Sequence, residues 1–415
     1  MPSQSYDVVI VGGGSAGIAT AASLLNRTKA LSIAIIEPSR THIYQPGWTM
    51  VGAGIFKPEE TIRPMANVMP KGTTWIEKGA AGFQPQQNAV ELDDGSLVGY
   101  RALIVTPGLK LNFAAIEGLE ETLGENGVTS NYRYDLAPYT WELARNLKSG
   151  TALFTQPPMP IKCAGAPQKA MYLSSDWWQQ KSALDKIDVQ FHNAGGVLFG
   201  VADFVPPLMK TINEYGINLN LNSQLVKVDG PNQIAYFNQI KDGEVIGQIE
   251  RQFDMLHVCP PQTGLDFMQN QPITDANGWL KVDPETLQNP DYANIFGLGD
   301  CVNTTNAKTA AAARKQAPVV AENLLAFLNH QPLPAGYDGY GSCPLTVSRS
   351  HILLAEFGYG GKLLPTFPKW LLEATKPSRF SWWLKASAMP PVYWHLMLKG
   401  REWLAKPIDR TQVKK

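Results

Sequence analysis

The chain has 415 residues, and its 36 lysines and arginines balance 36 aspartates and glutamates, so it carries no net formal charge. A neutral balance gives no support for nucleic-acid binding by the whole chain. Hydrophobic residues make up 44% of the sequence, which argues against disorder, and four cysteines are too few for a disulfide-stapled secreted fold. No apolar run reaches the about 18 residues of a membrane span, and no histidine pair has metal-ligand spacing, so no metal is expected.

The N-terminal segment predicts a β–α–β unit that binds a dinucleotide. An apolar strand over Tyr6–Val11 is followed by a glycine-rich turn, a helix over Ala16–Leu25 and a strand over Leu31–Ile36. The turn fits the G-x-G-x-x-G pattern, whose glycines let the backbone approach a pyrophosphate at the helix N-terminus. Glu37 ends the second strand, where a carboxylate accepts hydrogen bonds from the ribose hydroxyls of a dinucleotide. Its negative charge disfavours the ribose 2′-phosphate of NADP. The predicted cofactor contacts here are Gly12, Gly14, Ser15, Ala16, Gly17 and Glu37.

Two later signatures favour FAD over NAD at this first site. A Thr-Pro-Gly turn closes the short apolar strand Leu103–Val105, and a Gly-Asp pair closes the strand Ile295–Leu298. An Ala-rich helix is predicted next, over Lys308–Leu328. The sequence resembles flavoproteins with two dinucleotide-binding domains, in which such a Gly-Asp pair implies an acid on the flavin ribityl chain. A simple helix cap is the alternative for that acid. The predicted flavin contacts are Thr106, Gly108, Gly299 and Asp300.

A second α/β pattern follows, but it lacks its own phosphate loop. Strands over Thr151–Thr155 and Lys186–His192 alternate with helices over Lys169–Gln180 and Val205–Tyr215. The loop Gln156–Gly165 holds three prolines and one glycine, and proline supplies no N–H for a pyrophosphate. We therefore expect a reductant other than a nicotinamide.

These patterns predict an α/β fold with two tandem Rossmann-like dinucleotide-binding domains and a C-terminal amphipathic, membrane-associating region. The predicted division assigns residues 1–115 and 266–330 to an FAD-binding domain. It assigns 116–265 to the second Rossmann-like domain and 331–415 to the C-terminal membrane region.

The cysteines are the second chemical signal. Cys163 lies on the proline-rich loop beside Lys162, and Cys343 follows a Pro/Gly-rich linker. A loop thiol next to a cation is typical of a low-pKa thiolate, whereas the ordinary alternative is a small buried side chain. Two such thiols beside a flavin could pass it two electrons, but only the fold could bring them together. Cys259 and Cys301 are interpreted as structural.

The C-terminal segment is basic and rich in tryptophan. Residues 361–415 hold eleven Lys/Arg against three Asp/Glu, a net charge of +8, and five of the eleven tryptophans. Apolar and basic residues recur at roughly helical spacing from Phe367 to Leu404, interrupted at Pro377 and Pro390–Pro391. This predicts two or three short amphipathic helices lying in a membrane surface. The alternative is that the tryptophans pack on the protein's own core.

Four segments resemble the sulfide:quinone oxidoreductases, in the two-cysteine branch that includes the animal mitochondrial enzymes. They are Ile161–Lys169, Tyr44–Thr49, Lys308–Ala312 and Tyr337–Leu345. The similarity extends from about residue 6 to about residue 403, and no cysteine precedes Cys163, which fits that branch. The resemblance implies a glutathione-reductase-like flavoprotein with FAD. It also implies three further flavin-pocket residues, which are Gln45, Lys308 and Thr309. The candidates for quinone stacking are Phe357 and Tyr359.

The resemblance also implies a chemistry. Cys163 and Cys343 rest as a disulfide or sulfur-bridged pair, hydrosulfide attacks Cys343 and leaves a persulfide, and Cys163 passes two electrons to the flavin. A small acceptor (sulfide, sulfite, cyanide or a thiol) takes the sulfur, and a membrane quinone takes the electrons.

The implied partners are therefore sulfide, that acceptor, a quinone and the membrane surface, with no nucleic acid; a homo-oligomer is compatible with the sequence. The first strand starts too early for a signal or transit peptide, so we expect a monotopic protein of a bacterial cytoplasmic membrane. Two alternatives stay open: a type II NADH:quinone dehydrogenase, which needs the absent second phosphate loop, and a non-catalytic flavin and thiol redox sensor.

Overall fold

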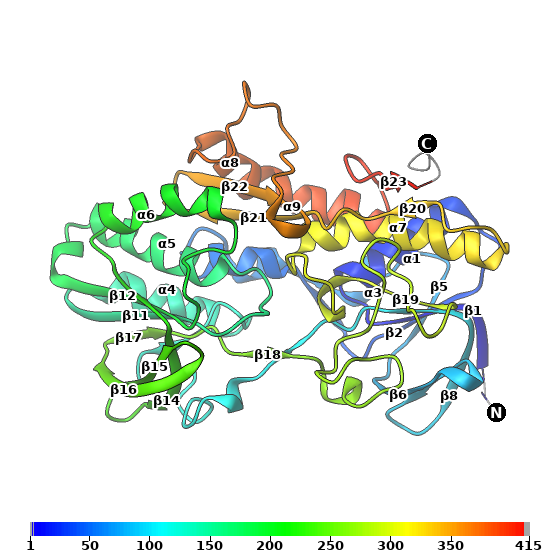
Figure 1. Cartoon of the computed structure of the whole chain (residues 1–415), viewed down its shortest axis with the longest axis horizontal. Helices are drawn as coiled ribbons and strands as arrows, with labels where there is room; N and C mark the ends of the chain where they lie inside the picture. Colours follow the sequence, from blue (N-terminus) through cyan, green and yellow to red (C-terminus); the bar gives the residue numbers. More distant parts are fainter. Residues whose placement is uncertain (1, 3, 411–415) are drawn as a thin grey trace.

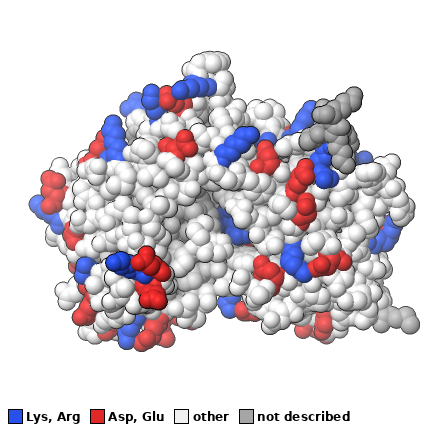
Figure 2. Space-filling model, in the orientation of Figure 1, with Lys and Arg blue, Asp and Glu red and all other residues white. Residues whose placement is uncertain are grey.

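A computed structural model describes residues 2 and 4–410. Two α/β lobes lie side by side, and the C-terminal segment runs across the top of both in Figure 1. Figure 2 shows this face hollowed between the lobes, with a basic side chain visible in the hollow.

The first lobe is built on a seven-stranded sheet. Strands β5, β2, β1 and β8 are parallel neighbours, β19 extends the sheet along β8, and β7 and β6 add an antiparallel edge. The inner strands are Val- and Ile-rich and buried, as expected where helices cover a parallel sheet. The elements are β1 (Gln4–Val11), β2 (Ile33–Ile36), β5 (Thr73–Ile76), β6 (Ala80–Gln84), β7 (Ala89–Leu92), β8 (Leu97–Val105), β19 (Ile295–Gly297), α1 (Ser15–Arg27), α2 (Trp48–Val51), α3 (Met65–Val68) and α7 (Ala310–Leu328).

The second lobe has a five-stranded parallel sheet in the order β10-β17-β11-β12-β13. A three-stranded antiparallel meander, β14-β15-β16, lies beside it. The elements are β10 (Val128–Thr129), β11 (Gly150–Gln156), β12 (Ile187–Asn193), β13 (Asn218–Leu221), β14 (Ser223–Asp229), β15 (Ile234–Lys241), β16 (Glu244–Gln252), β17 (Met255–His257), α4 (Ala137–Asn146), α5 (Ala166–Gln180) and α6 (Val205–Glu214). The predicted tandem α/β architecture is confirmed.

Short antiparallel pairs join distant parts of the chain. They connect β3 with β4, β9 with β18, β20 with β23, and β21 with β22. The β21–β22 hairpin matters most for function, because it packs against α5 of the second lobe. The elements are β3 (Thr41–Ile43), β4 (Ile62–Pro64), β9 (Lys110–Leu111), β18 (Gln262–Thr263), β20 (Ala335–Gly336), β21 (Gly341–Thr346), β22 (Ile352–Phe357) and β23 (Ile408–Asp409).

The C-terminal segment corrects one expectation, because it forms a single helical run instead of two or three short helices. The run joins α8 (Arg379–Trp383), a π-helical stretch (Leu384–Ala388), α9 (Met389–Pro391), a second π-helical stretch (Val392–Leu396) and a 3-10 turn (Met397–Lys399). The two prolines lack N–H groups and cannot donate the usual helical hydrogen bonds. The wider π turns on either side accommodate this loss. The prolines therefore do not divide the run.

The aromatic residues of this segment fall into two classes. Tyr393 and Trp394 are buried in the first-lobe core, whereas Trp370, Trp383 and Trp403 are 85%, 54% and 62% exposed. Packing on the protein's own core thus explains only part of the segment. Among the described residues no helix combines the length and apolar character needed to cross a bilayer.

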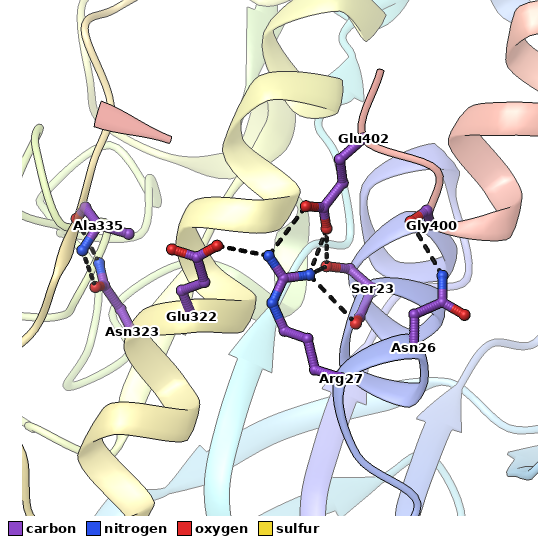
Figure 3. A network of polar contacts seen from close by, with 8 residues as sticks. All are labelled: Ser23, Asn26, Arg27, Glu322, Asn323, Ala335, Gly400 and Glu402. Atoms are coloured by element: carbon purple, nitrogen blue, oxygen red, sulfur yellow. Dashed lines mark hydrogen bonds and ion pairs between the residues drawn. The ribbon is translucent and has the colours of Figure 1, made fainter. Parts of the chain in front are cut away.

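An ion-pair cluster fastens the end of this run to the first lobe (Figure 3). Arg27, at the end of α1, pairs with Glu322 of α7 at 2.6 Å and with Glu402 beyond the C-terminal helix. The Ser23 hydroxyl donates to Glu402 at 2.7 Å. A Cβ at Gly400 would lie 2.6 Å from the backbone of α1, so the two segments are in direct backbone contact.

Candidate active site

The glycine-rich turn after β1 leaves backbone exposed to a ligand. Gly12 has φ +101°, and a Cβ at Gly17 would lie 2.0 Å from the Gly12 carbonyl oxygen, so both positions require glycine. A Cβ at Gly14 would meet no protein atom within 4 Å. Helix α1 has no side-chain cap at Gly14, which leaves its first N–H groups free to bind an anion. The turn fits a pyrophosphate at the positive end of α1, where Ser15 and Ala16 form the first turn.

Glu37 lies beside this turn at the carboxyl end of β2. Its Oε2 accepts the Gly13 N–H at 2.8 Å, and its Oε1 accepts the Ser39 N–H at 2.8 Å. Two backbone donors therefore hold the carboxylate at the cofactor side of the sheet. Its remaining lone pairs can accept the hydroxyls of a ribose.

Two further segments reach the same end of the first sheet. Thr106 donates its hydroxyl to the Gly12 carbonyl oxygen at 3.0 Å. Gly108 has φ +81°, and a Cβ there would meet no protein atom within 4 Å. Gly299, also at φ +81°, approaches α1 so closely that its Cβ would lie 3.1 Å from that of Ala16.

Asp300 and Lys308 form the third part of this region. Burial raises the pKa of Asp300, while the charges of Lys162 and Lys308 act in the opposite direction. Lys308 is 7% exposed, and its Nζ donates to the carbonyl oxygens of Asp300 at 2.9 Å and Val302 at 2.6 Å. Thr309 caps α7 by accepting the Ala312 N–H. The exposed backbone of the glycine-rich turn, the carboxylate of Glu37 and the buried acid Asp300 all lie at one end of the first sheet. Together they fit FAD.

The fold brings Cys163 and Cys343 together. Cys163 lies on the loop between β11 and α5, and Cys343 lies on β21, a strand where the sequence predicts a loop. Their sulfurs are 3.5 Å apart and both cysteines are free, since a disulfide bond measures about 2.05 Å. The Cys163 N–H donates to the Lys308 carbonyl oxygen at 2.8 Å. The pair therefore lies next to the segment that we expect to hold the flavin.

The cation in contact with Cys163 is Lys169, which corrects the expectation that Lys162 has this role. The Nζ of Lys169, on α5, lies 3.0 Å from the Cys163 sulfur. The hydrogen bond from Cys343 and the charge of Lys169 hold the pKa of Cys163 well below its usual range. The same bond and burial raise the pKa of Cys343. The reduced pair is therefore a Cys163 thiolate that accepts a hydrogen bond from a Cys343 thiol.

Lys162 instead contacts Gln45, the predicted flavin-pocket residue. Its Nζ donates to Gln45 Oε1 at 2.5 Å and lies 5.3 Å from the centre of the Trp48 ring. Burial lowers the pKa of Lys162, and the Asp300 carboxylate acts in the opposite direction. Gln45 is thereby tied to the cysteine loop.

The C-terminal helix adds a lysine that sequence analysis missed. Lys385 is 4% exposed, and its Nζ donates to the Pro46 carbonyl oxygen at 3.1 Å. Burial and the charge of Lys169 lower its pKa to about 7, while the charges of Cys163 and Cys343 raise it. No local pattern marks this residue, because only tertiary packing brings it near the pair. Lys169 had a usable signal, since it follows Cys163 by six residues on the next helix.

The place where a nicotinamide cofactor would meet α5 is filled by the protein. A Cβ at Gly165, the first residue before α5, would lie 2.2 Å from Leu345 Cδ2 and 3.0 Å from the Cys343 sulfur. Strand β21 thus packs on the N-terminus of α5, and the loop before it holds three prolines. A pyrophosphate has no room at this helix end.

The remaining candidates have ordinary surroundings. Burial raises the pKa of Cys259 and of Cys301 to about 12, so both stay neutral thiols.

Phe357 packs edge-on against Phe199 with 5.9 Å between ring centres, and the Tyr359 hydroxyl donates to a backbone carbonyl oxygen at 2.8 Å. Phe357 is the last residue of β22, in the hairpin that carries Cys343, and Tyr359 begins the 3-10 turn just after it. Within residues 2 and 4–410 no three His, Cys, Asp or Glu side chains are grouped as a metal site would require.

The chain was compared with known proteins. Residues 6–149 match the pyridine nucleotide-disulphide oxidoreductase family. The mitochondrial sulfide:quinone oxidoreductase of Dictyostelium discoideum is 40% identical over 96% of this chain and 87% of its own length. The mitochondrial enzyme of Mus musculus is 38% identical over 95% and 87%, respectively. The X-ray structure of the sulfide:quinone oxidoreductase of Aquifex aeolicus superposes with a TM-score of 0.76 and 20% identity, covering 96% of this chain and 92% of that one.

Proposed function

The chain belongs to the sulfide:quinone oxidoreductase family, and from this we propose that it oxidises sulfide through Cys163, Cys343 and FAD and reduces a membrane quinone. The observation that carries the proposal is the sulfur pair, 3.5 Å apart, with an ammonium group 3.0 Å from one sulfur only. When bound, FAD supplies a two-electron carrier between a thiol donor and a quinone. Its contacts would be the turn after β1, Glu37, and the segments at Thr106–Gly108 and Gly299–Lys308.

The asymmetry of the pair directs the first bond change. In the oxidised pair, hydrosulfide attacks the Cys343 sulfur, the Cys163–Cys343 bond breaks, and Cys163 leaves as a thiolate. Disulfide exchange is faster when the leaving thiol has the lower pKa. Lys169 stabilises the leaving sulfur, so the persulfide forms on Cys343.

The second half returns the pair to its oxidised state. The outer sulfur of the Cys343 persulfide passes to a small nucleophile (sulfide, sulfite, cyanide or a thiol), and Cys343 is left as a thiolate. The two thiolates then form the Cys163–Cys343 bond again, and this oxidation releases the two electrons that bound FAD would accept through Cys163. Lys385, with its pKa near 7, can hold or release one proton beside the pair at physiological pH.

A membrane site for the electrons is supported by the exposed part of the C-terminal segment. Trp370, Trp383 and Trp403 are at least half exposed, and residues 361–415 carry a net charge of +8. In Figure 2 the segment that projects between β22 and α8 ends in uncharged side chains, with basic and acidic ones nearby. Aromatic and basic side chains together favour an interfacial position on anionic bilayers, close to the quinone pool. We propose a monotopic protein; Phe357 and Tyr359 are the proposed quinone contacts.

The Cys163→Ser and Cys343→Ser variants test the proposal directly. Both should retain FAD, because neither thiol is among the proposed FAD contacts, and both should lose flavin reduction by sulfide in anaerobic stopped-flow. Cys259→Ser serves as the control, since that thiol is buried and neutral and lies outside the proposed FAD contacts. Normal turnover in either active-site variant would overturn the thiol mechanism.

A further inference from the structure

A groove on the first lobe lies outside the site described above. It has a volume of about 550 Å³ and lies between the second half of α1, the chain around α3 and the end of the C-terminal helix. This volume is within the range of about 300–1,000 Å³ that small-molecule sites occupy. None of the proposed cofactor or thiol residues lines it.

Three lysines from three parts of the chain line this groove. They are Lys29 after α1, Lys71 after α3 and Lys399 at the end of the helical run. No Asp or Glu lines the groove, and within the described chain none of the three lysines has an ion-pair partner within 4.0 Å. Like charges gathered without a counter-charge favour an anionic ligand.

The floor of the groove is apolar and held in a fixed position. Leu25 and Leu398 line it and are 6% and 1% exposed, and Met69 lies beside them. The Asn26 side chain donates to the carbonyl oxygens of Lys399 and Gly400, both at 3.0 Å, the second of which is visible in Figure 3. The backbone at Lys399 is thus fixed relative to α1, while its side chain stays exposed.

We infer that this groove binds one anionic phospholipid, with the phosphate among the three ammonium groups and an acyl segment along the leucine floor. A free phosphate would use only the charged rim, whereas a lipid uses the rim and the apolar floor together. The inference adds a specific lipid site to the proposed membrane association and involves no redox step.

The test uses the full-length FAD-loaded protein and a short-chain phosphatidylglycerol below its micelle concentration, so that no membrane surface is present. Isothermal titration should give saturable binding of one lipid per chain, and binding of inorganic phosphate should be at least tenfold weaker. The triple variant Lys29→Gln/Lys71→Gln/Lys399→Gln should raise the dissociation constant about 100-fold, which is about fivefold for each basic residue removed. Ala66→Trp, which fills the groove at an exposed position without changing charge, should do the same.

A matched control removes the same charge elsewhere. Lys186→Gln/Lys210→Gln/Lys241→Gln changes three exposed lysines of the second lobe and should leave lipid binding unchanged. Equal weakening by both triple variants would mean that net charge alone acts, and equal affinity for phosphate and lipid would mean that the floor takes no part. Either result would overturn the inference. Sulfide-dependent flavin reduction, measured in parallel, reports failure of the proposed enzymatic function separately.

Discussion

Removal of the Lys169 charge should shift the chemistry of Cys163 to higher pH. The Lys169 Nζ lies 3.0 Å from the Cys163 sulfur; the lysine is 2% exposed and the cysteine is half-buried. A hydrogen bond to a charged group contributes about 1.5–3 kcal/mol. Lys169→Met should therefore lower the thiolate-to-thiol ratio of Cys163 about 10- to 100-fold at a fixed pH.

The assay is the rate of iodoacetamide alkylation of Cys163 in the reduced protein, followed across pH by peptide mass spectrometry. Only the thiolate reacts, so the curve for Lys169→Met should move to higher pH than that of the native chain. The pH dependence of flavin reduction by sulfide should move in the same direction, because Cys163 becomes a poorer leaving group.

Two matched variants separate this effect from general damage. Lys169→Arg keeps the charge and should retain most of the low-pH reactivity. Lys181→Met removes a charge just after α5, far from the pair, and should leave the curve in place. The reasoning is refuted if Lys169→Met leaves the alkylation profile unchanged, or if Lys181→Met shifts it equally.

Three further outcomes are expected. Gly14→Ala should fold with near-native stability, because its Cβ meets no protein atom within 4 Å, but it should bind FAD weakly, because that Cβ would enter the cofactor site. Gly17→Ala should lose both stability and FAD binding, because its Cβ would lie 2.0 Å from a carbonyl oxygen. Flavin content and thermal unfolding check this, and full FAD content in Gly14→Ala would contradict the cofactor position. Replacing Trp370, Trp383 and Trp403 by Ser should weaken sedimentation with anionic vesicles but leave flavin reduction by sulfide intact; unchanged sedimentation would exclude these side chains as membrane contacts. Burial lowers the pKa of His42 to about 4, and the hydrogen bond to the Gly13 carbonyl acts in the opposite direction. Between pH 6.5 and 4 the folded state therefore binds fewer protons than an unfolded chain, in which the histidine pKa is near 6.5. The free energy of unfolding should fall over this pH range, by about 3 kcal/mol for this group. Urea unfolding at pH 7.5 and 5 should show a smaller loss for His42→Gln, and an equal loss would refute the assignment.

Local sequence patterns predicted the parts of the site that depend on backbone geometry. The turn after β1 must contain glycine at residues 12 and 17, and such a requirement is visible in the sequence. The Gly-Asp pair at residue 299 is visible for the same reason. The proline-rich loop before α5 also predicted, without any structure, that a second phosphate loop is absent.

Contacts between distant side chains could not be predicted in this way. Lys162 is next to Cys163 in sequence, but its side chain turns to Gln45, and Lys169 reaches the sulfur because the loop folds back onto the first turn of α5. Lys385 comes from the far end of the chain. The prolines at 390 and 391 predicted a break, yet the π turns around them keep the helix continuous.

The central claim is that sulfide, not a nicotinamide, delivers electrons to the flavin through the cysteine pair. The most direct measurement is the visible absorbance of the flavin in the purified, oxygen-free protein after sulfide is added, and separately after NADH is added. Sulfide should bleach the flavin, a quinone analogue should restore its colour, and NADH should have no effect. Bleaching by NADH, or none by sulfide, would contradict the claim.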